Sequence, residues 1–195
     1  RGKVPFPGTV ISFDAGRDVT IKALERANVT EDKLVFIAAQ KETEKEKISA
    51  SDIYQTGTVA RIRTSTKLPG GSMRIFAEGL YRAKARNIGF EGGYYYAVTD
   101  EIPPVHGDST LEEAYFRATK EMVKDTLLGD AMKFSKEAAA KLESCTDPDA
   151  YVNTVINVMR VRLEVKQEIL ETAQVIDRLR LLERCLNDEA EISKI

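Results

Sequence analysis

The sequence predicts an α+β protein in which a strand-rich first part is followed by an all-helical second part. Before about Pro103, apolar residues mostly alternate with polar ones and turn residues recur at short intervals. After it, apolar residues repeat every three to four positions to the end of the chain. The segment Pro103-Pro-Val-His-Gly-Asp108 lies where the pattern changes. We therefore expect a β-rich domain of twisted antiparallel sheets over residues 1–103 and a helical bundle over residues 108–195.

The composition is that of an ordinary water-soluble protein. The chain has 195 residues, of which 43% are hydrophobic and 31% charged, enough for one sizeable core or two small ones. A net charge of -2, with Lys and Arg spread along the chain, gives no basic stripe for nucleic acid. The longest apolar runs fall far short of the roughly 20 residues that a membrane helix needs, and none of them reads as the apolar h-region of a signal peptide. We expect a cytoplasmic protein, and Arg1 in place of Met suggests an excised fragment.

The first part begins with a strand, a short helix and a second strand. Val10–Phe13 is apolar and is preceded by Pro5-Phe-Pro-Gly8, whose prolines fix extended backbone and whose glycine turns it. Residues 17–28 carry apolar residues on one face and predict a helix. Leu34–Ala39 is too short for a typical helix and predicts a largely buried strand. For Lys41–Lys47 we expect a solvated loop rather than a charged interaction arm.

A β-hairpin comes next in the chain. Thr58–Thr66 and Met73–Tyr81 are β-rich runs separated by Leu68-Pro-Gly-Gly71. Pro69 presets the backbone at the second turn position, and one of the two glycines supplies a positive φ. The sequence therefore predicts two antiparallel strands joined by a tight turn.

The second strand of this hairpin contains an acid and a glycine in its apolar stretch. Gly79 predicts a bulge, after which the chain twists and continues over 82–88 as another strand. For Glu78 we expect a structural role, pairing with Arg61 or Arg82 or accepting backbone N–H groups at the bulge.

A last strand, Tyr94–Thr99, comes after a turn at Gly92-Gly93. Alternation places its side chains on two faces. One face holds Tyr94, Tyr96 and Val98, and the other holds Tyr95, Ala97 and Thr99. We expect at least one tyrosine to face away from the core.

The second part is predicted to hold five helices. Ser109-Thr-Leu-Glu112 is typical of a capping box that starts a helix running to about Leu128, with Gly129 as its stop. A second helix is expected over roughly 131–144. Asp147-Pro148 supplies an N-cap followed by proline at the first helical position of a third helix. A short fourth helix is expected over Leu163–Glu171.

The last helix is expected to be longer and to start at about Gln174. An apolar stripe lines one side of it, and the rest of its surface is charged. Such a helix packs on a bundle at its start and is expected to project beyond it at its end. The stripe consists of Val175, Leu179, Leu182 and Leu186.

Catalytic and cofactor chemistry is disfavoured by elimination. His106 is the single histidine and lies in the linker, so neither a His-rich zinc site nor a supported Ser-His-Asp triad is available. No Gly-x-x-x-x-Gly-Lys-Ser/Thr loop is present for ATP, and no serine lies in a recognisable nucleophile context. Cys145 and Cys185 fit two reduced thiols. We expect no catalytic, metal or cofactor site in this chain.

The remaining candidates are residues suited to contact with other chains. Apolar patches and sheet edges hold extended peptides. Each candidate taken singly is more typical of core packing, but together they are the best that the sequence offers. They are the apolar or amphipathic residues near turns and strand ends: Phe6, Leu68, Met73, Phe90, Tyr94, Tyr95 and Tyr96.

Several segments, in matching order and spacing, carry a resemblance to one family. The most specific are Gly57-Thr-Val-Ala-Arg-Ile62 and Glu78-Gly-Leu-Tyr-Arg-Ala83 of the hairpin. Together with the others, they resemble the amino-terminal domain of the Lon ATP-dependent protease over nearly the whole chain. Tyr94–Tyr96 and Lys41–Lys47 match no family pattern to which a function can be attached. The other segments are Phe6-Pro-Gly8, Asp14-Ala-Gly-Arg17, Ala38-Ala-Gln-Lys41, Asp52-Ile-Tyr54, Thr56-Gly-Thr-Val-Ala60 and Asp177-Arg-Leu-Arg-Leu-Leu-Glu183.

The resemblance implies a non-catalytic domain of a larger enzyme. The parent is implied to be a homohexameric AAA+ serine protease of the cytosol or mitochondria, which uses ATP and Mg²⁺ and carries its Ser-Lys dyad in a carboxy-terminal domain. This domain is implied to recognise unfolded, damaged or degron-bearing proteins in protein quality control and to help organise the oligomer. The alternative is a free-standing Lon-domain binding module or adaptor for a small ligand or a specific partner. The helical second part favours the first interpretation, since a connector has a purpose only if a ring is attached to it.

Overall fold

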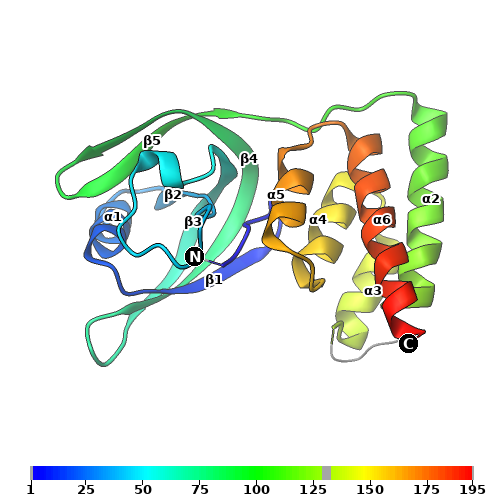
Figure 1. The fold of residues 1–195 in the computed structure, drawn as a ribbon, viewed down its shortest axis with the longest axis horizontal. Coiled ribbons are helices and arrows are strands. Elements are labelled where there is room, and N and C mark those ends of the chain that lie inside the picture. The colour runs from blue at the N-terminus through cyan, green and yellow to red at the C-terminus, as the bar shows by residue number, and fades with distance from the viewer. Residues whose placement is uncertain (1, 129–132, 195) are drawn as a thin grey trace. The chain divides into compact units, whose positions relative to one another are not determined.

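The computed structural model describes residues 2–128 and 133–194, which fall into two compact units, Arg1–Pro103 and Pro104–Ile195 (Figure 1). Within the described residues, the first unit holds a five-stranded antiparallel sheet with one α-helix, and the second is helical. The predicted α+β class is confirmed.

The first unit is a curved sheet organised around one long strand, β4 (Figure 1). Its sheet order is β1-β4-β3-β2, and β5 also pairs with β4. β1 lies along the first part of β4, from Val10 opposite Glu78 to Ala15 opposite Met73, whereas β5 lies along the second part. The elements are β1 (Val10–Ala15), α1 (Asp18–Asn28), β2 (Leu34–Ile37), the 3₁₀-helix η1 (Ala50–Asp52), β3 (Thr56–Lys67), β4 (Met73–Glu91) and β5 (Tyr94–Glu101).

Two predictions about the strands need correction. The expected break after Tyr81 is absent, because β4 continues through the bulge as a single strand of 19 residues. β2 is half-exposed rather than largely buried, since it is the last strand in the sheet order and only one of its edges is paired. The bulge itself is confirmed: the register passes from Ala60 opposite Gly79 to Val59 opposite Tyr81.

Gly79 is where the N-terminal segment crosses the hairpin. The amide of Gly8 donates to the carbonyl of Gly79 at 2.9 Å, and the amide of Gly79 donates to the carbonyl of Thr9 at 2.9 Å. A Cβ on Gly79 would lie 2.6 Å from the carbonyl oxygen of Phe6, which is too close for any side chain. The Phe6-Pro-Gly8 and Glu78-Gly79 segments are therefore two halves of one contact.

The core of the sheet lies on the side that faces α1. It joins buried residues of β1, α1, β3 and β4, with partly buried residues packed around its margin. Apolar burial of this kind supplies most of the stabilisation of such a unit. The buried members are Ile11, Ala15, Leu24, Ala27, Ala60, Ile62, Met73, Ile75 and Ala77.

The β3–β4 turn forms as predicted. The amide of Leu68 donates to the carbonyl of Ser72 at 2.8 Å, which closes the hairpin. Both Gly70 and Gly71 have positive φ, at 93° and 92°, a conformation that costs glycine little. The turn therefore uses both glycines rather than one.

The second unit is a helical bundle in which α6 packs against α2, α4 and α5. The predicted apolar stripe of α6 is confirmed, since Val175, Leu179, Leu182 and Leu186 are fully buried. The helices are α2 (Ser109–Thr126), α3 (Lys136–Ser144), α4 (Pro148–Val158), α5 (Leu163–Glu171) and α6 (Val175–Ser193).

The start of α2 differs from the prediction. Asp108, not Ser109, is the N-cap, and its carboxylate accepts from the amide of Leu111 at 2.9 Å. Glu112 instead binds the Nδ1 of His106 at 2.7 Å, so the predicted capping box is wrong. The predicted stop at Gly129 and the predicted start of the next helix at 131 lie outside the described residues.

The starts of α3 and α4 are set by side-chain caps. α3 begins at Lys136, where Ser135 caps it by accepting from the amide of Ala138 at 3.1 Å. α4 begins as predicted: the carboxylate of Asp147 accepts from a backbone amide, and Pro148 occupies the first turn.

A buried cation fixes α6 within the bundle. The guanidinium of Arg178 is fully buried and forms an ion pair with Asp149. It also donates to the side-chain oxygen of Asn153 and, at 3.1 Å, to the carbonyl of Ile169. Buried charges require such partners, so this network ties α6 to α4 and α5.

Candidate functional site

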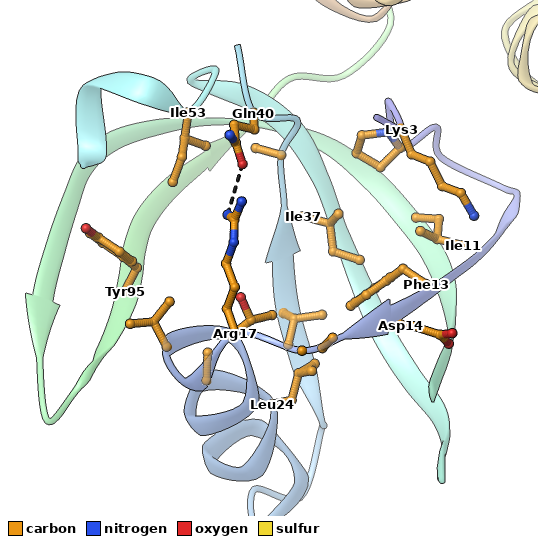
Figure 2. Close-up of a pocket in the computed structure, with 18 of the residues that line it drawn as sticks. Lys3, Ile11, Phe13, Asp14, Arg17, Leu24, Ile37, Gln40, Ile53 and Tyr95 are labelled. Carbon is orange, nitrogen blue, oxygen red and sulfur yellow. Dashed lines mark hydrogen bonds between the residues drawn. The ribbon is translucent and has the colours of Figure 1, made fainter. Parts of the chain in front are cut away.

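The first unit contains an open pocket of about 1020 Å³ (Figure 2). It is lined by β1 and the segment after it, by one side of α1, by β2, and by Tyr95 of β5. Its walls are mainly apolar, and a few polar side chains enter it. The apolar side chains include Ile11, Phe13, Leu24, Val35, Ile37 and Ile53.

The pocket exists because the curved sheet does not close. β1 and β2 are the terminal strands of the sheet order, and residues of both line the pocket. The amide of Ile62 in β3 donates to the carbonyl of Lys33. Lys33 is therefore in a hydrogen-bonded pair with β3. Bonded and non-bonded pairs alternate along antiparallel strands, so the backbone groups of Leu34 and Phe36 point away from β3. Among the described residues no other strand pairs with this side of β2, which therefore presents a free strand edge beside the pocket.

The apolar wall is incompletely covered. Phe13, Val35 and Ile37 pack against the core but stay partly exposed where they face the pocket. Apolar surface left open in a concave site is typical of binding surfaces. The wall can therefore bury apolar side chains of a bound molecule.

A polar network crosses the pocket. In Figure 2 the side chain of Arg17 runs from the chain between β1 and α1 to Gln40, with Tyr95 on one side and Phe13 and Ile37 on the other. Its Nη1 donates to Oε1 of Gln40 at 2.9 Å, and its Nη2 donates to the carbonyl of Lys45 at 3.1 Å. Gln40 is only 4% exposed, and its Nε2 donates to the carbonyl of Lys45 at 2.6 Å. The two side chains thus hold each other and the 41–47 loop in place.

Two carboxylates near the pocket have lowered pKa values. Hydrogen bonds from Arg74 at 3.0 and 3.2 Å lower the pKa of Asp14. The backbone amide of Ser49 and the ammonium of Lys45 lower the pKa of Asp52 to about 2. Both carboxylates are therefore charged at neutral pH.

The predicted contact residues do not form one site. Phe6 is 0% and Met73 5% exposed, so these two predictions are wrong: the side chain of Phe6 is buried, and Met73 belongs to the sheet core. Leu68 lies half-buried in the β3–β4 turn. Phe90 is 56% exposed at the other end of β4, far along the strand from Leu68.

The tyrosine strand divides as its alternation predicts. Tyr96 is 41% exposed on the face away from the core, where its ring covers Gly89. Tyr95 lies on the other face, packs edge-on against Phe90 with ring centroids 4.9 Å apart, and lines the pocket. Its hydroxyl donates to the carbonyl of Ile48 at 2.8 Å. Tyr94 is half-buried beside the turn. Of the three, Tyr95 is the pocket residue.

The predicted partners of Glu78 are also wrong. Its carboxylate accepts from Nε of Arg63 at 2.8 Å rather than from Arg61 or Arg82. Arg63 is the extra residue of a second bulge, which places its side chain beside Glu78. Arg61 instead donates to the carbonyl of Asp32 at 3.2 Å. Arg82 is 2% exposed, and burial lowers its pKa to about 10. All four lie on β3 or β4 of the sheet.

Sequence reasoning missed the pocket residues Arg17 and Gln40 as candidates. Both lie in segments that carried the family resemblance, Asp14-Ala-Gly-Arg17 and Ala38-Ala-Gln-Lys41. Their hydrogen bond shows why two motifs 23 residues apart belong together. A charged and an amide side chain in two such matching segments were the signal that could have found them.

Metal and membrane sites are not found among residues 2–128 and 133–194. There, no group of three or more His, Cys, Asp and Glu side chains is placed to hold a metal ion. None of the described helices combines the length and apolar character needed to cross a bilayer. Cys145 and Cys185 are free thiols, and His106 is exposed beside Glu112.

Comparison with known proteins places the chain in one family. Residues 1–188 match the model of the ATP-dependent protease La (LON) substrate-binding domain. The chain is 32% identical over 201 residues to Lon protease of Clostridioides difficile and 31% identical over 198 residues to Lon protease 1 of Bacillus subtilis. Each alignment covers 100% of this chain and 25% of the relative. The chain thus spans about a quarter of the length of these relatives.

Solved structures share the fold. The N-terminal domain of Mycobacterium avium complex Lon protease superimposes with a TM-score of 0.76 at 22% identity, covering 95% of this chain and 94% of that one. A Lon N-terminal domain protein from Xanthomonas campestris gives a TM-score of 0.62 at 11% identity, covering 94% of both chains. At these identities the structures show the fold alone. The family match over residues 1–188 shows that the chain belongs to the ATP-dependent protease La (LON) substrate-binding domain family.

Proposed function

We propose that this chain is the non-catalytic substrate-recognition part of an ATP-dependent serine protease, and that it holds unfolded, damaged or degron-bearing proteins. The family's description as a substrate-binding domain and the relatives named Lon protease support this. ATP hydrolysis, with its Mg²⁺, and peptide cleavage by a Ser-Lys dyad belong in this proposal to the rest of the parent protein. So do assembly into a homohexameric ring and a place in the cytoplasm.

The proposal rests on one feature of the first unit, the composition of its pocket. The pocket combines partly exposed apolar walls with a free strand edge on β2. An unfolded segment offers what such a site binds, namely apolar side chains and unpaired backbone amides and carbonyls. A folded protein keeps both inside. The pocket therefore favours unfolded over folded chains without requiring a particular sequence.

A pair of variants on opposite faces of the sheet tests the proposal. Ile37→Asp places a charge on the apolar wall, and Val10→Asp places the same charge on β1, where Val10 is 69% exposed and outside the pocket. Burying apolar side chains against a carboxylate is unfavourable, so we expect Ile37→Asp to weaken binding of a reduced, carboxymethylated protein by about tenfold or more. Val10→Asp is expected to leave the affinity unchanged. Fluorescence anisotropy of the labelled unfolded protein measures both.

Equal affinities of the two variants and the original chain would show that the pocket is not the binding surface. Tight binding of the same protein in its native, folded state would contradict the proposed preference. Melting curves of both variants check that the fold is intact.

The second candidate is a free-standing binding module. The pocket volume of about 1020 Å³ is at the upper limit of small-ligand sites, which favours this interpretation. The two candidate functions predict different sequences downstream of residue 195 in the natural reading frame. A Walker A motif there supports the protease, and an early stop codon supports the module.

A further inference from the structure

The charges around the pocket are not balanced. Six charged residues line it, and Asp14 and Arg74 neutralise each other through two hydrogen bonds. Three cations then face one carboxylate, Glu46. The lining therefore carries more positive than negative charge beside its apolar walls, an arrangement that attracts anionic groups. The three cations are Lys3, Arg17 and Lys47.

Arg17 is the most restrained of the three cations. Its two hydrogen-bond acceptors, the side-chain oxygen of Gln40 and the carbonyl of Lys45, are both neutral. Within the described part of the chain, the structure gives Arg17 no carboxylate partner. A guanidinium has five N–H donors, and two are used here. The charge and the remaining donors of Arg17 are left for a ligand.

Gln40 holds the guanidinium of Arg17 in a fixed position. It is almost fully buried and is itself fixed by its hydrogen bonds to the backbone of Glu42 and Lys45. An arginine held by a rigid neighbour loses little side-chain entropy when it binds an anion. Arg17 also lies between apolar side chains of the pocket, where water competes less for the guanidinium (Figure 2).

We propose that Arg17 binds a carboxylate of the unfolded segment held in the pocket, so that the preferred ligand is an apolar segment bearing one acidic group. This inference rests on the proposed function and specifies its substrate. A planar carboxylate matches the forked donors of a guanidinium. The carboxylate comes either from the end of a chain or from an Asp or Glu side chain, and the chemistry at Arg17 is the same for both.

Three labelled ten-residue peptides test the inference. All carry the same alternating apolar side chains; one ends in a free carboxylate, one ends in an amide, and the third ends in an amide but has Glu at its penultimate position. We expect either acidic peptide to bind the complete chain about tenfold more tightly than the neutral amide, the gain of a charge-assisted hydrogen bond at a half-buried site. A gain in only one of the two acidic peptides would restrict the carboxylate to the chain end or to a side chain, respectively.

Variants then assign the gain to Arg17. Arg17→Gln keeps hydrogen-bond donors near Gln40 but removes the charge, so the acidic and neutral peptides should bind alike. Arg17→Lys should retain part of the difference. Arg26→Gln removes a cation from the exposed side of α1 outside the pocket, and it should leave the full difference in place.

A measurement without variants covers the case in which Arg17→Gln fails to fold. Raising NaCl from about 0.05 to about 0.5 M should shrink the advantage of the acidic peptides on the unmodified chain and leave the neutral peptide little changed. Equal affinities of the three peptides at low salt would overturn the inference about Arg17 while leaving the proposed function intact. Failure of every peptide and of the unfolded protein to bind would overturn the proposed function itself.

Discussion

At the scale of single residues, Gly57 is required because two strands approach closely there. A Cβ at Gly57 would lie 2.2 Å from the carbonyl oxygen of Ile37 in β2. β2 would have to move away from β3, and β2 is also the strand that borders the pocket. This glycine therefore connects the family motif of the hairpin to the position of the pocket edge.

Gly57→Ala is expected to destabilise the first unit by about 2 kcal/mol or more, since overpacking of this kind costs about 1–3 kcal/mol. Gly16→Ala is the matched control, because a Cβ there meets nothing within 4 Å and its φ is not positive. We expect the control to change stability by less than about 0.5 kcal/mol. Urea unfolding, monitored by the methyl NMR signals of Ile62 and Ile75, measures the stability of the first unit alone. Equal midpoints for the two variants would contradict the close approach of β2 and β3.

Asp52 predicts a pH dependence of the loop beside the pocket. Its pKa of about 2 lies below the ordinary value of 3.8, first because of the Ser49 amide and then because of Lys45. A carboxylate with a lowered folded-state pKa stabilises the fold above its unfolded pKa, and that contribution is lost as the pH falls toward the folded pKa. The turn at residues 49–52 is thus expected to hold above about pH 4 and to loosen toward pH 2.

An NMR titration of the Asp52 carboxyl carbon checks this, with an expected midpoint near pH 2. Lys45→Met should raise the pKa only partway, because the Ser49 hydrogen bond remains. A midpoint near 3.8 in the unmodified chain would show that the turn is not formed as described.

Residue-level prediction from sequence succeeded where the cause was local. The N-cap at Asp147, the turn between β3 and β4 and the bulge at Gly79 arise from backbone rules that act over a few residues. The capping box at Ser109 failed because Asp108 is an equally good cap, and a local pattern does not choose between neighbours. Phe6 was misplaced because the segment that carries it pairs with Gly79, which is 73 residues away in the sequence, and local patterns do not show such a contact.

At the scale of elements, the outer edge of β2 and the apolar wall beside it make up the proposed site. No local pattern marks this edge, since an edge is defined by which strands pair across the sheet. The periodicity of Leu34–Ile37 indicated a buried strand, and the structure leaves it half-exposed for this reason. The shape of the pocket was therefore beyond the reach of sequence reasoning, although several of its residues, Arg17 and Gln40 among them, lie in the family motifs.

Pairing with a strand edge predicts a pattern in the backbone of the ligand. In an antiparallel pair, only every second residue of the added strand points its amide at the edge. N-methylation of two such amides in a ten-residue peptide should weaken binding by about tenfold, from the loss of two modest hydrogen bonds. The same peptide methylated at the two intervening residues is the control and should bind as before. Equal losses in both peptides, or none in either, would exclude edge pairing.

At the scale of the whole molecule, the two units have different roles in the proposed function. The first unit contains the pocket, whereas the second is a bundle whose buried interior is tied together by Arg178 and the α6 stripe. Its α6 presents an apolar stripe inward and charged residues elsewhere. We expect the second unit to contribute to the parent protein's architecture and not to contact the unfolded segment.

The most direct measurement is an NMR titration of the uniformly ¹⁵N-labelled chain with a permanently unfolded protein. We predict that the amide shifts move at residues of the pocket, notably Phe13, Arg17, Ile37 and Tyr95, and stay unchanged in α2 to α6. Shifts confined to the helical unit, or to the exposed Phe90 of β4 and Tyr96 of β5 with no change in the pocket, would contradict binding in the pocket.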